Sequence, residues 1–118
     1  MPSDFPPAAR LHRPSEYALA LQGPRVARGA MFVVSRPRVA ATTPARLGLI
    51  VPKRHAPLAV TRNAIKRVLR EAFRQRRAEL PPGDLVFRLV VRVEPCSLTA
   101  LKRRVRLEAD ALLCRIAR

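Results

Sequence analysis

The sequence has few of the residues that form metal sites or disulfide bonds. It contains two cysteines, Cys96 and Cys114, and two histidines, His12 and His55, with no C-x-x-C spacing and no paired Cys or His cluster. A zinc site is therefore not expected, and the thiols should be free in a reducing compartment. The N-terminal residues lack a signal-peptide core, and no apolar run approaches the length of a membrane span. These absences predict a soluble cytoplasmic protein.

Acidic residues are also scarce. The chain has eight, dispersed along its length: Asp4, Glu16, Glu71, Glu79, Asp84, Glu94, Glu108 and Asp110. Metal-dependent cleavage of a phosphodiester usually needs clustered carboxylates or histidines. Glu108 and Asp110 are two positions apart on a predicted helix and so do not face each other. We therefore expect neither a catalytic residue nor a bound metal ion in this chain.

The scarcity of acids leaves a large positive charge. The sequence has 24 Lys and Arg residues against 8 Asp and Glu residues, a net charge of +16. Such a charge repels itself in the compact state, and counterion release from phosphates favours the binding of clustered cations to nucleic acid. The 48% hydrophobic content argues against disorder. A folded nucleic-acid-binding protein is expected, with binding to a membrane surface as the less favoured alternative.

The order of predicted elements is helix, two strands, helix, strand, helix. The boundaries follow from apolar periodicity and from the positions of proline and glycine. They predict a tail at 1–13, a helix from Ser15 to Gly23, and strands at 30–35 and 46–51. A helix from an N-cap at Thr61 to Pro81, a strand at 84–93 and a helix at 98–117 follow. Residues 36–45 are expected to join the first two strands as a wide hairpin. Helices packed on one small sheet account for this order, which predicts a single-domain α+β two-layer sandwich over residues 14–118. The central helix would lie in a βαβ crossover between parallel strands.

The central stretch "TRNAIKRVLREAFRQRR", residues 61–77, separates apolar from basic residues. At about 100° per residue, Ile65, Val68, Leu69 and Ala72 form a buried stripe, with Phe73 at its border. The opposite arc holds Arg62, Asn63, Lys66, Arg67, Arg70, Arg74 and Arg77. Like charges at i,i+4 spacing, and cations at the positive end of the helix dipole, destabilise the helix unless an anion binds there. This pattern favours a nucleic-acid-binding face over a merely solvated one, and Lys53 and Arg54 in the preceding loop would extend it.

The residues around this helix resemble a known family. "LGLIVPKRHAPLAVTRNAIKRVLREAFR" resembles the core of the bacterial ribonuclease P protein component, with "RPSEYALAL" and "LPPGDLVFRLV" similar to the flanking elements. The resemblance implies an α/β sandwich whose βαβ crossover is left-handed. It also implies a protein that binds a large catalytic RNA, one protein per RNA, and contacts the 5′ leader of precursor tRNA. The RNA subunit, with Mg²⁺, would carry out the hydrolysis.

The resemblance also assigns roles to single residues. Arg62, Asn63, Lys66 and Arg67 match the family's basic motif, Lys53 and Arg54 match the basic pair after the strand, and Arg70 and Arg74 extend the same face of the helix. These eight residues form the predicted RNA-binding set. Ala64 stands where the family usually has a second arginine, so any contact made by that side chain must be absent or supplied elsewhere.

A cleft for the single-stranded leader is implied between the first helix and the sheet. Tyr17 matches an aromatic residue of that cleft, and Leu21 stands where relatives often carry a second one. Strand alternation places Met31, Val33 and Ser35 on one face, which we expect to face the cleft. Because aromatic residues make up only 4% of the chain, leader binding should depend more on charge and apolar contact than on stacking. The predicted cleft set is Tyr17, Leu21, Val33 and Ser35; a plain core role for Tyr17 is the alternative.

Two functions are compatible with the charge and the fold. The chain could be the protein subunit of ribonuclease P, or it could be a structural RNA-binding protein, such as a ribosomal protein of similar fold. The "TRNAIKR" stretch and its spacing from the preceding strand favour the first.

Overall fold

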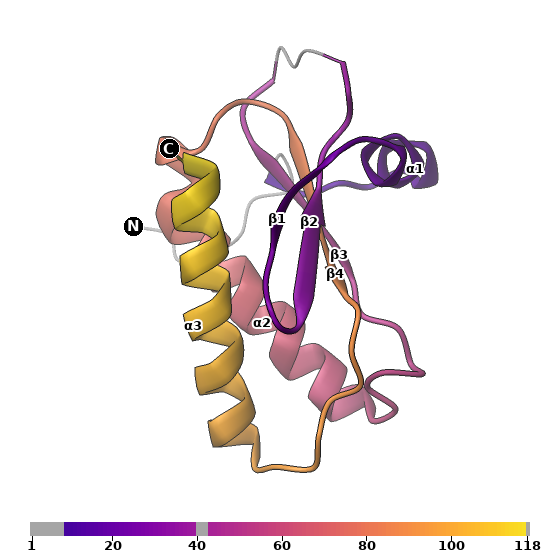
Figure 1. Ribbon diagram of the computed structural model, residues 1–118, viewed down its shortest axis with the longest axis vertical. Helices are drawn as coiled ribbons and strands as arrows, with labels where there is room; N and C mark the ends of the chain where they lie inside the picture. Colours follow the sequence, from indigo (N-terminus) through magenta and orange to yellow (C-terminus); the bar gives the residue numbers. More distant parts are fainter. Residues whose placement is uncertain (1–8, 40–42, 118) are drawn as a thin grey trace.

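The computed structural model of the chain describes residues 9–39 and 43–117. Three helices, one 3-10 turn and one sheet of four strands are present in this part of the chain (Figure 1). In chain order they are α1 (Pro14–Gln22), β1 (Arg25–Arg28), β2 (Phe32–Ser35), β3 (Arg46–Ile50), α2 (Ala59–Arg76), η2 (Arg77–Glu79), β4 (Asp84–Leu89) and α3 (Leu98–Ala117).

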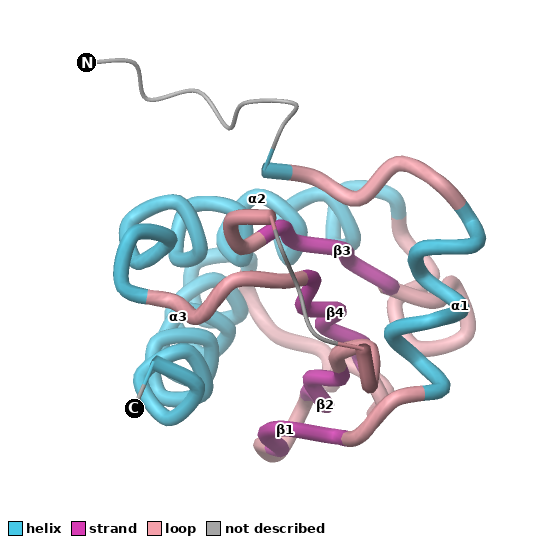
Figure 2. Tube along the Cα trace, turned by 90° about the horizontal axis from the view of Figure 1, so that it is seen from above, coloured by secondary structure: helices cyan, strands magenta, loops and turns pink. Residues whose placement is uncertain are grey.

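The strands lie in the order β1-β2-β4-β3. β1 pairs with β2 and β2 pairs with β4 in antiparallel fashion, whereas β3 and β4 are parallel and are connected through α2. Figure 2 shows α2 and α3 on one face of the sheet and α1 on the other. The α+β class and the βαβ crossover are thus confirmed. The left-handed course that the resemblance implies for the crossover stays a prediction.

Two predictions about the strands were wrong. The sequence analysis missed β1, "RVAR", which has only four residues and a bulge between Arg25 and Ala27 in its pairing with β2. The expected hairpin between the strands at 30–35 and 46–51 does not form, because β4 lies between β2 and β3. β4 takes this central position because it is apolar on both faces over most of its length, and its neighbours satisfy its backbone on both edges.

Several predicted boundaries also move: β4 ends at Leu89 and not at residue 93, and α2 ends at Arg76, where a 3-10 turn begins. α2 begins at Ala59 with Leu58 at the N-cap. Thr61, the expected cap, therefore lies inside the helix and donates its N–H to the Leu58 carbonyl at 3.1 Å. The predicted tail at 1–13 is wrong from residue 9 onward. Ala9 and Leu11 are buried, and the Leu11 N–H donates to the Leu47 carbonyl at 3.0 Å. This segment therefore covers the outer edge of β3; residues 1–8 lie outside the described residues.

The main core lies between the sheet and the two long helices. Side chains from alternate positions of the strands meet those of α2 and α3, and the largest of them are fully buried: Phe32, Val34, Phe87, Leu89, Ile65, Leu69, Phe73, Leu101, Val105, Leu112 and Leu113. Each such side chain contributes about 1.5–3 kcal/mol to folding. On α2 the predicted stripe is correct for Ile65, Leu69 and Ala72, whereas Val68 is only half-buried and Phe73 is fully buried.

Arg46 fixes α1 to the sheet. Its guanidinium binds both carboxylate oxygens of Asp84 at 2.8 and 3.0 Å, and it lies 3.1 Å from Glu16 at the start of α1. Glu16 in turn accepts the backbone N–H groups of His12 and Arg13, each at 3.1 Å. The hydrogen bonds from Arg13 and His12 lower the pKa of Glu16, and the bond to Asp84 raises the pKa of Arg46. This cluster sets where α1 crosses the face of the sheet.

Glu108 attaches the β1–β2 hairpin to α3. From α3, its carboxylate accepts the backbone N–H of Met31 at 2.8 Å and that of Phe32 at 2.7 Å. Gly29 permits this approach, since a Cβ there would lie 2.5 Å from a carboxylate oxygen of Glu108. Two charge-assisted bonds to backbone donors thus attach the hairpin to the helical layer.

Replacement of Glu108 by alanine should destabilise the fold, because it leaves two N–H groups at the start of β2 without an acceptor. We expect Glu108→Ala to lower the free energy of unfolding by about 2 kcal/mol in urea titrations. Glu94→Ala is the matched control, since Glu94 is exposed and forms no ion pair within the described residues. Equal stabilities for the two variants would show that the Glu108 bonds are not needed.

Candidate nucleic-acid interface

The acidic side chains are mostly engaged with structural partners. Besides Glu16, Asp84 and Glu108, Glu71 binds Arg74, and Asp110 lies 3.0 Å from Arg106 and 3.6 Å from Arg76 between α2 and α3. Within the described residues, these acids therefore pair with arginines or, in the case of Glu108, with backbone N–H groups. Two pockets are lined by several further cations.

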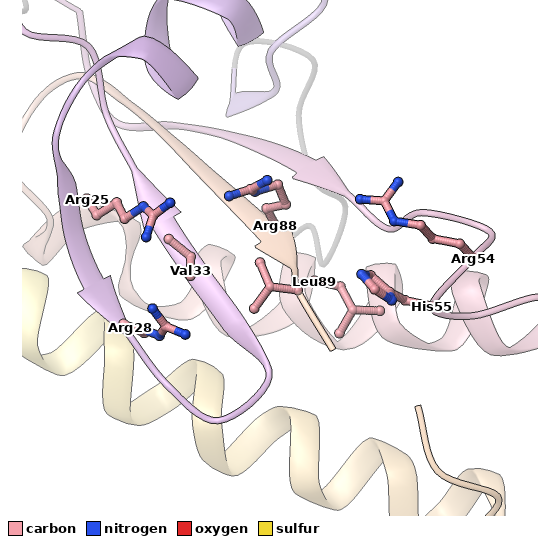
Figure 3. Close-up of a pocket in the computed structure, with 8 residues that line it drawn as sticks. Arg25, Arg28, Val33, Arg54, His55, Arg88 and Leu89 are labelled. Carbon is pink, nitrogen blue, oxygen red and sulfur yellow. The ribbon is translucent and has the colours of Figure 1, made fainter. Parts of the chain in front are cut away.

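The first group lies on the sheet face opposite α2 and α3. A pocket there is lined by Arg25, Arg28, Val33, Arg54, His55, Arg88, Leu89 and Val90. Figure 3 shows the guanidinium groups of Arg25, Arg28 and Arg88 around Val33, with Arg54 and His55 on the far side of Leu89. None of the four arginine side chains has a carboxylate within 4.0 Å in the part of the chain that the structure describes. The pocket is thus a concave surface of one charge sign.

The second group lies at the outer edge of β3, where residues from α1 and α2 line one pocket although the two helices lie on opposite faces of the sheet. This pocket is lined by Arg10, Tyr17, Leu47, Leu49, Lys66 and Arg70. Burial, and then the nearby charge of Arg10, lower the pKa of Arg70, although a guanidinium remains charged at any physiological pH. The structure therefore brings Tyr17, from the predicted leader cleft, beside Lys66 and Arg70, from the predicted RNA-binding set.

Other members of the RNA-binding set differ in how available their charge is. Lys53, Asn63 and Arg67 are exposed. Arg74 forms a bidentate pair with Glu71 at 3.1 and 2.6 Å, which lowers the pKa of Glu71 and raises that of Arg74. Arg74 therefore adds less to the field of this face than its position on the helix suggests.

Arg62 has a structural role that the sequence did not indicate. Its Nη1 donates to the carbonyls of Ala56 at 2.9 Å and Pro57 at 2.8 Å. These bonds hold the loop that leads from β3 into α2, the same loop that carries Lys53 and Arg54. Arg62 can still present its other N–H groups outward, because a guanidinium has five donors.

The predicted cleft residues do not form one uniform surface. Tyr17 is half-buried and packs with Leu11, Ala20 and Val86, as expected for a core residue. It also lines the second pocket, as expected for a cleft residue. Its ring lies close to β3, because a Cβ on Gly48 would be 2.7 Å from its Cε1. Leu21 is 40% exposed, whereas Ser35 is buried. Val33 is also buried and lines the first pocket.

Met31 does not belong to the cleft face. It packs in the main core, because Glu108 holds its N–H in the turn before β2, where strand alternation does not yet apply. Ala64 is buried at 8% exposure, so the position that departs from the family motif faces the interior rather than the basic arc.

Sequence reasoning missed Arg10, Arg25, Arg28 and Arg88 as candidate binding residues. Arg25 and Arg28 belong to the strand that was not predicted, and Arg10 lay in the supposed tail. Arg88 carried a readable signal: in "DLVFRLVV" it interrupts an apolar strand, and its neighbours Phe87 and Leu89 both point to the core. By alternation, Arg88 had to occupy the opposite face.

Within the described residues, no group of three or more His, Cys, Asp or Glu side chains is placed to hold a metal ion. None of the helices there combines the length and the apolar character needed to cross a membrane.

Comparisons with known proteins bear on the family. The sequence matches the family model "Ribonuclease P" over residues 5–117. It is 63% identical over 115 residues to the ribonuclease P protein component of Bordetella avium (strain 197N), a match covering 97% of this chain and 96% of that protein. The RNase P protein of Staphylococcus aureus has a similar structure, with a TM-score of 0.67 at 24% identity over 92% of this chain and 91% of that one. The Thermotoga maritima RNase P protein gives a TM-score of 0.63 at 23% identity, covering 86% and 96%. The structural matches show the shared fold, and the sequence matches confirm the resemblance.

The two carbonyl bonds of Arg62 predict that it supports the fold as well as the charge of the surface. Arg62→Ala should lower the free energy of unfolding by about 1 kcal/mol, because the Ala56 and Pro57 carbonyls lose their donor. Arg67→Ala, on an exposed position of the same helix, should change it by less than about 0.5 kcal/mol. Both variants remove one positive charge from α2. Arg62 lies in the first turn, where the helix dipole opposes a cation, so the dipole alone would make Arg62→Ala the more stable of the two, opposite to the predicted difference. Urea unfolding of the two variants measures the difference, and equal values would refute the structural role.

Proposed function

Because the chain belongs to the ribonuclease P protein family, we propose that it binds the catalytic RNA of ribonuclease P and the 5′ leader of precursor tRNA. In this role it assists the endonucleolytic removal of the leader, which produces the mature 5′ end of the tRNA. The observation that carries this proposal is that the acids pair with other groups. Lys66, Arg67 and Arg70 on α2, and the arginines of the open sheet face, therefore have no carboxylate partner among the described residues.

The two cationic surfaces differ in shape, which supports a different binding partner for each. Asn63 and Arg67 project from the exposed side of α2, where a helix can lie against the backbone of a folded RNA. The open sheet face is concave and is bounded by α1, so it suits a single strand better than a duplex. We assign the exposed side of α2 and Lys53 to the catalytic RNA, and the sheet face with Tyr17 to the leader.

Hydrolysis is assigned to the RNA subunit and its magnesium ions. Mg²⁺ prefers oxygen ligands from carboxylates and phosphates, and the carboxylates of the described residues are dispersed or held by arginines. The protein instead supplies fixed positive charge, which lowers the repulsion between two polyanions that must come together. We further propose that one protein binds each catalytic RNA and that the complex acts in the cytoplasm, where tRNA precursors are processed.

Reconstitution tests the proposed function. The purified protein is combined with a bacterial ribonuclease P RNA and a precursor tRNA at a magnesium concentration too low for efficient cleavage by the RNA alone. The protein should stimulate cleavage at the correct 5′ site. If it binds the RNA without stimulating cleavage, it acts as a structural RNA-binding protein; if it does neither, the proposal fails.

Lysine offers a matched pair for testing the α2 surface. Lys66 lines the pocket between α1 and α2, whereas Lys102 is exposed on α3. Lys66→Ala should weaken binding to the RNA and flatten the slope of log K against log salt by roughly 0.7–0.9, the change expected for one lost phosphate contact. Lys102→Ala should leave both nearly unchanged. Filter-binding or fluorescence titrations at several salt concentrations measure the slopes, and equal slopes for the two variants would contradict the assignment.

A further inference from the structure

A third pocket, which we call the α2–α3 pocket, lies at the end of the molecule where α2 and α3 both begin (Figure 1). Its volume is about 410 Å³, against about 240 and 120 Å³ for the two cationic pockets. Its lining is mostly apolar: Ala56, Pro57, Leu58, Val93, Pro95, Leu98 and Leu101, completed by Thr61, Arg92, Glu94 and Cys96. Small-molecule sites commonly measure about 300–1,000 Å³ and combine apolar walls with a few polar groups. The α2–α3 pocket therefore has the size and lining of a ligand site.

Hydrogen bonds hold the two walls of this pocket together. The segment after β4 binds the loop before α2, because Arg92 Nη1 donates to the Arg54 carbonyl at 3.2 Å and the Val93 N–H donates to the His55 carbonyl at 2.9 Å. From α2, Arg62 holds the next two carbonyls of the same loop. The pocket is thus formed before any partner binds, which lowers the entropic cost of binding.

Leu58 is an unusual residue for its place at the start of α2. It occupies the N-cap position, its side chain makes no cap hydrogen bond, and it is 64% exposed. Leucine is among the poorest N-cap residues, so its presence costs helix stability. Leu98, at the first position of α3, is 38% exposed and lines the same pocket. Exposed leucines that line one concave surface indicate that a partner covers it.

Charge and position favour RNA as this partner. The net charge of +16 opposes contact between two copies of the chain. The start of α2 supplies Leu58 and Thr61 to the pocket and, two positions further on, Asn63 to the exposed side assigned to the catalytic RNA. Lys53, assigned to the same RNA, belongs to the loop that forms one wall. An RNA whose phosphates lie on this surface therefore has bases within reach of the pocket.

The rim of the pocket carries polar groups that suit the edge of a nucleobase. Arg92 and Glu94 are both exposed, and neither forms an ion pair within the described residues. Guanidinium groups donate to base edges, and carboxylates accept from their amino groups. Apolar side chains can contact the faces of a base that has left its stack. A phosphate would fit less well here, because Glu94 would repel it.

We propose that the α2–α3 pocket holds one unstacked nucleobase of the catalytic RNA. This inference rests on the proposed function and deepens it, since α2 binds phosphates and the pocket adds a contact to a base. It predicts that part of the affinity for the RNA is insensitive to salt, because burying a base against apolar walls releases no counterions.

Leu58→Ala tests the pocket, and Leu107→Ala, at a position of α3 that is 69% exposed, is the matched control. Leu58→Ala should weaken binding of the protein to the catalytic RNA about fivefold, the loss expected for part of one buried apolar side chain. The slope of log K against log salt should stay unchanged, unlike that of Lys66→Ala. Leu107→Ala should match the unsubstituted protein in affinity and slope. Because alanine caps a helix no better than leucine, thermal unfolding should not distinguish Leu58→Ala from the unsubstituted protein.

Catalytic RNA that lacks single bases at random positions tests whether the contact is made to a base. RNA molecules that bind the protein are separated from those that do not, and the missing positions are mapped in both pools. At one position, loss of the base should weaken binding to the unsubstituted protein and not to Leu58→Ala, because the base and the leucine act through the same contact. If Leu58→Ala does not fold, Leu98→Ala provides the same comparison.

Three results would overturn this inference: equal affinities for Leu58→Ala and Leu107→Ala, a flatter salt slope for Leu58→Ala, or no missing base that affects the two proteins differently. A dimer of the free protein that Leu58→Ala abolishes, with RNA affinity unchanged, would assign the pocket to a second copy of the chain instead. Failure of the unsubstituted protein to bind the catalytic RNA would refute the proposed function itself, so the two failures are distinct.

Discussion

Each residue along β2 and β4 points to the opposite face of the sheet from the residue before it. Phe32 and Val34 on β2, and Phe87 and Leu89 on β4, therefore all enter the core beneath α2 and α3. The intervening residues Val33 and Arg88 must occupy the other face. The rest of the structure depends on this constraint. A shift of β4 by one residue would bury Arg88 in the core and expose Phe87 and Leu89, so packing of the core also fixes the position of the charge.

The placement of the acids completes this separation of charge. An arginine-rich chain needs internal partners for the arginines that hold its elements together. Arg46 has them in Glu16 and Asp84, and Arg76 of α2 lies 3.6 Å from Asp110 of α3. Glu108 is used on backbone donors instead, where it secures the β1–β2 hairpin. Because so few acids remain, Arg25, Arg28, Arg54 and Arg88 on the open sheet face have no carboxylate partner among the described residues. The scarcity of acidic residues in the sequence is thus the physical origin of the cationic sheet face, and not only of a high net charge.

The sequence predicted the elements that carry strong periodicity. α3 spans the predicted residues, and Ile65, Leu69 and Ala72 face the core as the helical pattern indicated. β1 could not be predicted, because a four-residue strand with two arginines becomes a strand only through pairing with β2. The neighbours of β4 are likewise a property of the whole sheet. Contacts such as that of Arg62 with the Ala56 and Pro57 carbonyls depend on loop geometry, which spacing along the chain does not reveal.

The central claim is that the unpaired arginines of the sheet face bind RNA while the paired arginines hold the fold. Nitrogen-15 NMR of the arginine side chains tests it directly, because each Nε–H group reports on its own partner. On titration with a single-stranded RNA copy of a precursor leader, the Nε–H resonances of Arg25, Arg28 and Arg88 should shift. Those of Arg46 and Arg106, which are bound to carboxylates, should not. Shifts confined to arginines outside the sheet face, such as Arg103, with no change at Arg88, would contradict the account.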